Sequence, residues 1–137
     1  MRLTKTNNTK IASFFISMCL LSILGCKKID KKPKLEQIEK GQKLFTSVGC
    51  ATCHSLSGKK LYGPSLNTIL GTEIKVIRKK VEHTVIIDKN YILQSIIHPD
   101  FEKPIEFKNS KMPKPILTTN EINCIVDYII SINKKTN

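Results

Sequence analysis

The five residues Cys50-Ala51-Thr52-Cys53-His54 constrain this chain more than any other stretch. Two cysteines three positions apart are followed at once by a histidine. A structural zinc site needs four ligands, usually completed by a second Cys or His pair, and the chain beyond this motif offers only the scattered His83, His98 and Cys124. A redox C-x-x-C pair is expected beside a βαβ pattern, whereas this motif follows a helical pattern. Zinc and thiol redox chemistry are therefore both disfavoured.

The order C-x-x-C-H is instead the attachment signature of a c-type haem. Two cysteines at the start of a helix reach both vinyl groups of one porphyrin and form thioethers, while the adjacent histidine ligates the iron. With 5 Cys and 3 His in 137 residues, chance would produce the motif roughly 0.004 times per chain. We therefore predict one covalent haem c, held by Cys50, Cys53 and His54.

The N-terminus has the pattern of an export signal. Three basic residues precede an uncharged apolar block, Ile11 to Leu24, that is short for a membrane span. The block ends in Ile23-Leu24-Gly25-Cys26, which resembles the lipobox of bacterial lipoproteins. We expect residues 1–25 to be a signal peptide and Cys26 to be lipidated. Cleavage elsewhere, or an uncleaved anchor, is the alternative.

The expected export and the charge of the remaining chain together limit the classes of partner. Removal of residues 1–25 would leave 112 of the 137 residues, one small domain, and would lower the net charge from +12 to +9. Residues 26–34 are lysine-rich and favour a solvated tether, with the folded domain over residues 35–135. The positive charge favours acidic protein partners or anionic surfaces. We expect a protein lipid-anchored to a bacterial membrane, on its periplasmic or extracytoplasmic side, with no nucleic-acid partner.

Two helices are expected to frame the domain. Apolar residues recur at helical spacing from Leu35 to Val48, and Gly49 can end that helix. Gly41 inside it costs about 1 kcal/mol relative to Ala, so we expect a close contact there. The natural partner is a C-terminal helix, whose apolar stripe runs from Ile122 to Ile132 after a capping-box pattern, Thr118 with Glu121 or a cap at Thr119.

The segment between these helices should line the haem. The carbonyl of Pro64 can accept the Nδ1 proton of His54, which would fix the imidazole. The β-branched runs between Thr72 and Ile87 predict a small hairpin that turns around Lys79 and Lys80. A short helix from Tyr91 to Ile97 should follow and end at His98-Pro99.

Met112 is the expected sixth ligand. It is the only methionine outside residues 1–25 and lies in Lys111-Met112-Pro113, a Lys- and Pro-rich loop before the last helix. A thioether ligand stabilises ferrous iron and raises the potential. Its rivals are Lys111, His98 at a helix end and His83, which we expect near the hairpin turn. Cys124 is expected to be a small reduced thiol without a redox role.

These motifs together resemble a class I cytochrome c, from about residue 36 to residue 134. Beside C-x-x-C-H, the chain has the family's G-P-x-L at Gly63-Pro64-Ser65-Leu66, its M-P at Met112-Pro113 and its closing helix. The stretch around Asp88 to Ile96 is similar to the haem-c domain fused to subunit II of some terminal oxidases. These residues contain no copper-binding domain of that kind, so we expect a free-standing, lipid-tethered version. The segment Phe101 to Ser110 lacks the glycine expected before M-P.

The resemblance implies an all-α fold, the class I cytochrome c fold, with a small inserted β-hairpin at about residues 72–88. It also implies one-electron transfer, feeding or draining a membrane-associated respiratory complex in the cell envelope, and no catalysis by the protein itself. Exposed lysines would steer acidic redox partners, namely Lys59, Lys60, Lys111 and Lys114. The alternative is a haem-c subunit or sensor module of a larger oxidoreductase complex, with a labile distal Met112.

Overall fold

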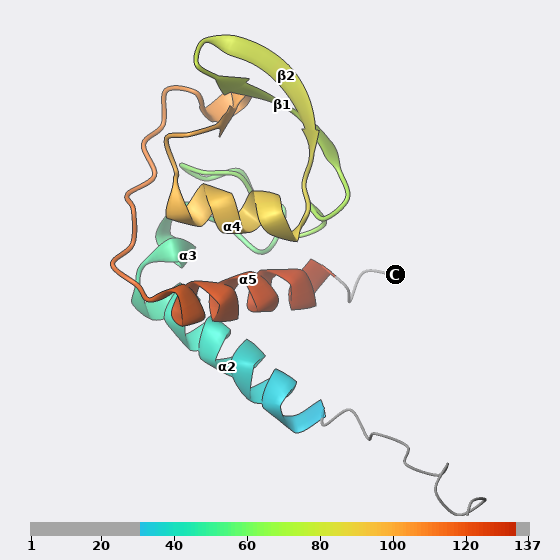
Figure 1. Cartoon of the computed structure of the whole chain (residues 1–137), viewed down its shortest axis with the longest axis vertical. Coiled ribbons are helices and arrows are strands. Elements are labelled where there is room, and N and C mark those ends of the chain that lie inside the picture. Colours follow the sequence, from blue (N-terminus) through green and yellow to red (C-terminus); the bar gives the residue numbers. More distant parts are fainter. Residues whose placement is uncertain (1–30, 134–137) are drawn as a thin grey trace, which may run out of the picture. The chain divides into compact units, whose positions relative to one another are not determined.

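The computed structural model describes residues 31–133, and side chains from residue 34 onwards (Figure 1). The expected signal peptide, the expected lipidation site at Cys26 and the first part of the tether lie outside the described residues. No helix in the described part of the chain is both long and apolar enough to cross a bilayer.

Two long helices pack against each other, α2 (Lys31–Ser47) and α5 (Thr119–Asn133) (Figure 1). Helix α2 begins four residues before the predicted start. The expected close contact at Gly41 is present, because a Cβ built there would lie 2.0 Å from the backbone oxygen of Cys124 on α5. Only a glycine lets the two backbones approach this closely.

The start of α5 is fixed by the predicted capping box. The backbone N–H of Thr118 donates to Glu121 Oε2 at 2.9 Å, and the backbone N–H of Glu121 donates to Thr118 Oγ1 at 3.3 Å. Thr118, rather than Thr119, is therefore the capping residue.

The predicted hairpin is present as β1 (Glu73–Arg78) and β2 (Val81–Ile86), which pair antiparallel. The turn residues Lys79 and Lys80 have φ of 51° and 68°, the left-handed values that a tight hairpin turn requires. His83 lies within β2 opposite Val76, so its predicted place near the turn is wrong.

A third strand, β3 (Lys103–Pro104), pairs with the other edge of β1 and gives the order β2-β1-β3. The sequence did not predict it, because two residues ending in a proline carry no strand pattern. The fold is thus mainly helical as expected, with a small three-stranded sheet in place of a hairpin alone.

Helix α4 (Lys89–Ile97) follows β2 in the chain and packs on α5 (Figure 1). Asp88 caps it by accepting from the backbone N–H of Tyr91 at 2.7 Å, and it ends at His98. The short 3-10 helix η2 (Ile105–Phe107) comes after β3. The core lies among α2, α4 and α5 and consists of Phe45, Ile87, Ile92, Ile96, Ile122, Ile125, Val126, Tyr128 and Ile129.

Candidate haem site

The two cysteines of the motif form a helix of their own, α3 (Cys50–Cys53). Gly49 separates it from α2 with φ of +86°, a left-handed conformation that costs glycine little. The backbone N–H of Gly49 donates to the carbonyl of Thr46 at the end of α2. The carbonyl of Gly49 accepts from the backbone N–H of Thr52 in α3. This glycine therefore turns the chain into a new helical turn, which Cys50 begins and Cys53 ends.

The thiols are unbridged and partly accessible. Burial raises the pKa of the Cys50 thiol, a backbone hydrogen bond lowers it, and the charge of Cys53 raises it again. Thiol redox pairs need the opposite, a lowered pKa that provides a thiolate. The raised pKa of Cys50 therefore does not favour the thiolate that such a pair uses.

The ring of His54 is oriented by the loop that follows it. His54 Nδ1 lies 2.9 Å from the carbonyl oxygen of Pro64, the contact expected from the sequence. A carbonyl can only accept, so Nδ1 carries the proton and Nε2 keeps its lone pair for a metal. Gly63 packs against the same ring, because a Cβ there would lie 2.6 Å from His54 Cε1.

That loop is tied back to the attachment motif. The backbone N–H of Gly63 donates to Cys53 at 2.9 Å, and that of Leu66 donates to Ser55 at 2.9 Å. Ser55 is buried, its hydroxyl donates to the backbone carbonyl of Lys59, and its Oγ lies 3.1 Å from the hydroxyl oxygen of Ser65. The position of Pro64 relative to His54 is therefore set by several hydrogen bonds rather than by one.

Asn133, at the end of α5, holds the far side of the loop. Its Nδ2 donates to the carbonyl of Leu66 at 2.8 Å, and its Oδ1 accepts from the backbone N–H of Ile69 at 2.7 Å and of Leu70 at 3.2 Å. The sequence does not predict this role. An asparagine at the polar end of a helix gives no signal of a contact with residues more than 60 positions away.

Met112 lies in residues 110–118, which have no regular structure, as predicted. Its partly buried side chain packs against the core cluster and lines a cavity of about 330 Å³ at the C-terminal end of α4. His98 and Lys114 line the same cavity. The structure therefore brings one of the rival ligands, His98, close to Met112.

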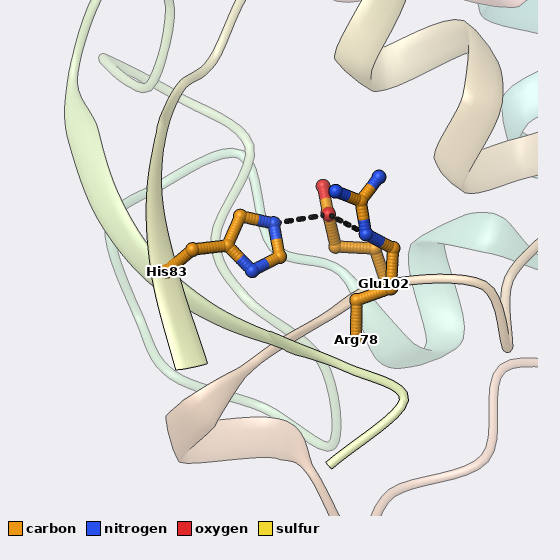
Figure 2. Close-up of polar contacts among 3 residues, drawn as sticks. All are labelled: Arg78, His83 and Glu102. Atoms are coloured by element: carbon orange, nitrogen blue, oxygen red, sulfur yellow. Dashed lines mark hydrogen bonds and ion pairs between the residues drawn. The ribbon is translucent and has the colours of Figure 1, made fainter. Parts of the chain in front are cut away.

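The other rivals have different surroundings. His83 Nε2 lies 2.6 Å from Glu102 Oε1, and Arg78 Nε lies 3.7 Å from the same oxygen (Figure 2). A histidine engaged in this way is a poor candidate for an iron ligand. Lys111 is exposed, and its backbone N–H lies 3.4 Å from the Tyr62 hydroxyl.

The four predicted steering lysines are all exposed. Lys60 forms an ion pair with Glu106 at 2.9 Å and lies 5.0 Å from the centre of the Phe107 ring. The charge of Lys60 is therefore partly offset, and steering would depend mainly on Lys59, Lys111 and Lys114.

The residues present fit a haem. They supply two accessible thiols, an imidazole with a free Nε2, and a thioether. Partly buried apolar side chains from the intervening segments pack around the core, among them Leu66, Ile69, Leu93 and Ile97. One buried hydroxyl, that of Tyr91, has no hydrogen-bond partner among the described residues. Apolar side chains of this kind suit a large apolar ring system. The cavity at Met112 is lined by residues 97–101, 112 and 114, and its lining does not include Cys50, Cys53 or His54.

Comparison with known proteins agrees with this assignment. The family model described as cytochrome c matches residues 38–133. Similar solved structures include two of an engineered cytochrome c from Rhodothermus marinus, Rma TDE. The first is 16% identical, covers 79% of this chain and 84% of its own, and has a TM-score of 0.47.

The second is the same engineered protein bound to a carbene intermediate, 1-ethoxy-1-oxopropan-2-ylidene. It is 16% identical, covers 79% of this chain and 83% of its own, and has a TM-score of 0.45. No curated protein matches the chain. The family match spans most of the described residues and includes the whole C-x-x-C-H motif. The chain therefore belongs to the cytochrome c family, with a covalently bound haem c and a role in haem-based electron transfer.

Proposed function

We propose that this protein is a monohaem electron carrier whose haem is attached through Cys50 and Cys53 and ligated by His54 and Met112. The observation that carries the proposal is the 2.9 Å contact between His54 Nδ1 and the Pro64 carbonyl, which leaves Nε2 as a ligand. With a second ligand from Met112, the iron has no open position for substrate. Electron transfer through the haem edge is the chemistry that remains.

The physiological partner is proposed to be an acidic redox protein within a membrane-associated respiratory complex of the cell envelope. Lipidation at Cys26 would hold the carrier at a bacterial membrane on the periplasmic or extracytoplasmic side, which keeps it near such a complex. Weak redox interfaces are small and rely on charge for encounter. The exposed Lys59, Lys111 and Lys114 provide charge of the required sign.

A second candidate is a haem-c subunit or sensor module of a larger oxidoreductase complex with a labile Met112. The observation in its favour is that Met112 lies on a segment without regular structure and shares its cavity with His98 and Lys114. A ligand held in this way could exchange with a neighbour or with a gas.

Substitution of Met112 tests the ligand assignment. Met112→Ala should convert low-spin to high-spin ferric iron and lower the reduction potential, because the thioether that favours ferrous iron is lost. His98→Ala is the matched control from the same cavity and should leave the ferric spectrum unchanged. An unchanged spectrum in Met112→Ala would reassign the sixth ligand.

Carbon monoxide separates the two candidates. The reduced carrier should bind it slowly at neutral pH, because Met112 must first leave the iron. Rapid binding would favour the sensor module.

Charge steering is tested by stopped flow with an acidic redox partner. The exchange rate should fall as ionic strength rises, since screening shortens the reach of exposed charges. Replacement of Lys59, Lys111 and Lys114 by Gln should slow exchange at low salt. Replacement of Lys43, Lys75 and Lys80 by Gln changes the net charge equally and should have a smaller effect. A rate indifferent to salt would contradict the steering proposal.

A further inference from the structure

Lys103 contacts the segment that carries Met112. Its Nζ donates to the backbone carbonyl of Ser110 at 3.0 Å and lies 2.7 Å from Asp100 Oδ1. Only 20% of the Lys103 side chain is exposed, although a lysine is ordinarily a surface residue unless its charge is paired. Ser110 stands two positions before Met112, and Asp100 lines the same cavity as Met112. The ammonium group of Lys103 therefore joins the wall of that cavity to the segment that brings Met112 to it.

The backbone of Lys103 is held by the sheet. Lys103 lies in β3 and pairs with Ile77 of β1, and the next residue, Pro104, pairs with Val76. Val76 is fully buried, so this part of β1 is packed inside the fold. The lysine side chain therefore extends toward Ser110 from a fixed position.

Glu102 adds side-chain contacts to the same sheet. Its Oε1 lies 2.6 Å from His83 Nε2 on β2 and 3.7 Å from Arg78 Nε on β1 (Figure 2). Only 13% of the Glu102 side chain is exposed, so solvent and salt screen these contacts less than they screen a surface ion pair. Two consecutive residues thus contact different parts of the fold, Glu102 the sheet and Lys103 the segment before Met112.

The bond to Ser110 should matter more than the ion pair with Asp100. The Asp100 side chain is 77% exposed, and ion pairs at exposed positions contribute little. The Ser110 carbonyl belongs to a segment without regular structure, and a charged donor bonds it more strongly than a neutral donor does.

The neighbouring contact is weaker. The backbone N–H of Lys111 lies 3.4 Å from the hydroxyl of Tyr62, a residue that is 58% exposed. A hydrogen bond of that length at the surface contributes little. Of these two contacts just before Met112, the one from Lys103 is therefore the stronger.

We propose that Lys103 is a positioning residue for the sixth ligand: it fixes the backbone at Ser110 and thereby slows the departure of Met112 from the iron. This inference rests on the ligation by Met112 proposed above. Movement of the Ser110 backbone away from β3 must break the bond to Lys103. The small sheet thus anchors the loop that carries the ligand, and the bond from Lys103 is the connection between them.

The experiment compares the haem-loaded wild type with Lys103→Gln, which keeps most of the side-chain stem and loses the charged donor. Imidazole is added to the ferric protein. At saturating imidazole the binding rate reports how fast Met112 leaves the iron, because the ligand position must first be vacated. This limiting rate should rise by about tenfold in Lys103→Gln, the factor expected for the loss of one charge-assisted hydrogen bond.

Lys108→Gln is the matched control. Lys108 is an exposed lysine five positions along the chain, and its replacement changes the net charge by the same amount. Its limiting rate should match that of the wild type, and Asp100→Asn should raise the rate by less than Lys103→Gln does. Equal rates in Lys103→Gln and wild type, or equal increases in Lys103→Gln and either of the other variants, would overturn the proposal.

Amide hydrogen exchange gives a second readout that does not depend on imidazole. Exchange at Lys111 and Met112 should accelerate in Lys103→Gln, whereas exchange at Ile92, a buried residue of α4, should stay as in the wild type. Acceleration at all three positions would indicate a general loss of stability and would overturn the positioning role.

Met112→Ala separates failure of this inference from failure of the ligand assignment. Loss of the sulfur-to-iron charge-transfer band in Met112→Ala, together with wild-type behaviour of Lys103→Gln, would leave the ligation standing and overturn the role of Lys103. An unchanged ferric spectrum in Met112→Ala would contradict the ligation itself.

A measurement on the wild type covers the case in which Lys103→Gln does not fold. In NMR spectra of the reduced protein, the ammonium protons of Lys103 should exchange with water more slowly than those of Lys108, because the Ser110 carbonyl holds them. Equal exchange at the two ammonium groups would overturn the proposal as well.

Discussion

Gly41 on α2 lies against the backbone carbonyl of Cys124 on α5, so that a Cβ at position 41 would stand 2.0 Å from the carbonyl oxygen and 2.9 Å from Tyr128 Cβ. The crossing of these two helices supports the rest of the domain. The loop that orients His54 is bound to the end of α5, and the attachment helix α3 directly follows α2.

Gly41→Ala should therefore destabilise the protein although alanine is the better helix former. The added methyl group meets backbone rather than a movable side chain, and overpacking of this kind costs about 1–3 kcal/mol or more. Denaturant unfolding measures the loss. The neighbouring Gln42→Ala, at an exposed position of the same helix, should change stability by less than about 0.5 kcal/mol. Equal stability of Gly41→Ala and wild type would show that the helices do not cross here.

Gly63→Ala should change the ligation of the iron by His54 rather than the packing of the core. A Cβ at position 63 would lie 2.6 Å from His54 Cε1, so the ring must rotate and its hydrogen bond to Pro64 weakens. That bond raises the basicity of the ligand, and its weakening should shift the reduction potential and broaden the ferric EPR spectrum.

Gly58→Ala provides the control for Gly63→Ala. Gly58 has φ of +83° and its Cβ would meet only Asn67 at 3.9 Å, so alanine there strains the loop without touching His54. It should lower stability and leave the spectrum alone. A spectrum perturbed by Gly58→Ala but not by Gly63→Ala would contradict the described geometry.

Asn133→Ala should loosen the loop of residues 66–70. The substitution removes an amide that bonds the carbonyl of Leu66 and the N–H groups of Ile69 and Leu70, and unsatisfied backbone groups cost about 1–3 kcal/mol. Thermal unfolding gives the stability, and amide hydrogen exchange should accelerate at Ile69 and Leu70. Asn123→Ala, elsewhere on α5, should do neither. If amide hydrogen exchange at Ile69 and Leu70 is unchanged in Asn133→Ala, Asn133 does not hold this loop.

The capping interaction of Glu121 should make the free energy of unfolding depend on pH. The hydrogen bonds from the Thr118 hydroxyl and backbone hold the pKa of this carboxyl below its ordinary value of 4.5. Because the pKa is lowered by folding, the contribution is fully present above pH 4.5 and is lost as pH falls through the folded value. Glu121→Ala should thus be less stable than wild type at pH 7, with the difference shrinking in acid. A difference independent of pH, or one that persists in the Thr118→Ala background, would argue against the capping box.

The sequence predicted those parts of the site that depend on local chemistry. C-x-x-C-H, the Pro64 carbonyl, the capping box and the close contact at Gly41 are each defined by a few neighbouring residues, and each is present. The turn at Lys79 and Lys80 was also placed correctly, because the β-branched runs on either side define it.

Contacts that join distant segments were missed. β3 exists because Lys103 and Pro104 meet the edge of β1, and nothing within that dipeptide indicates a strand. Glu102 fixes His83 within the sheet, and Asn133 fixes a loop more than 60 residues away, through tertiary contacts that no spacing rule covers. The lysine-rich composition of residues 31–34 predicts a tether, whereas in the structure these residues form the first turn of α2.

The account depends above all on one porphyrin bound through Cys50 and Cys53. The intact mass of the purified protein measures this, together with its reduced pyridine haemochrome spectrum. We predict one haem per chain with both vinyl groups converted to thioethers, retained in Cys124→Ser and lost when Cys50 and Cys53 are both replaced by Ser. A colourless wild-type protein whose mass contains no tetrapyrrole, or a haem that survives the double substitution, would contradict it.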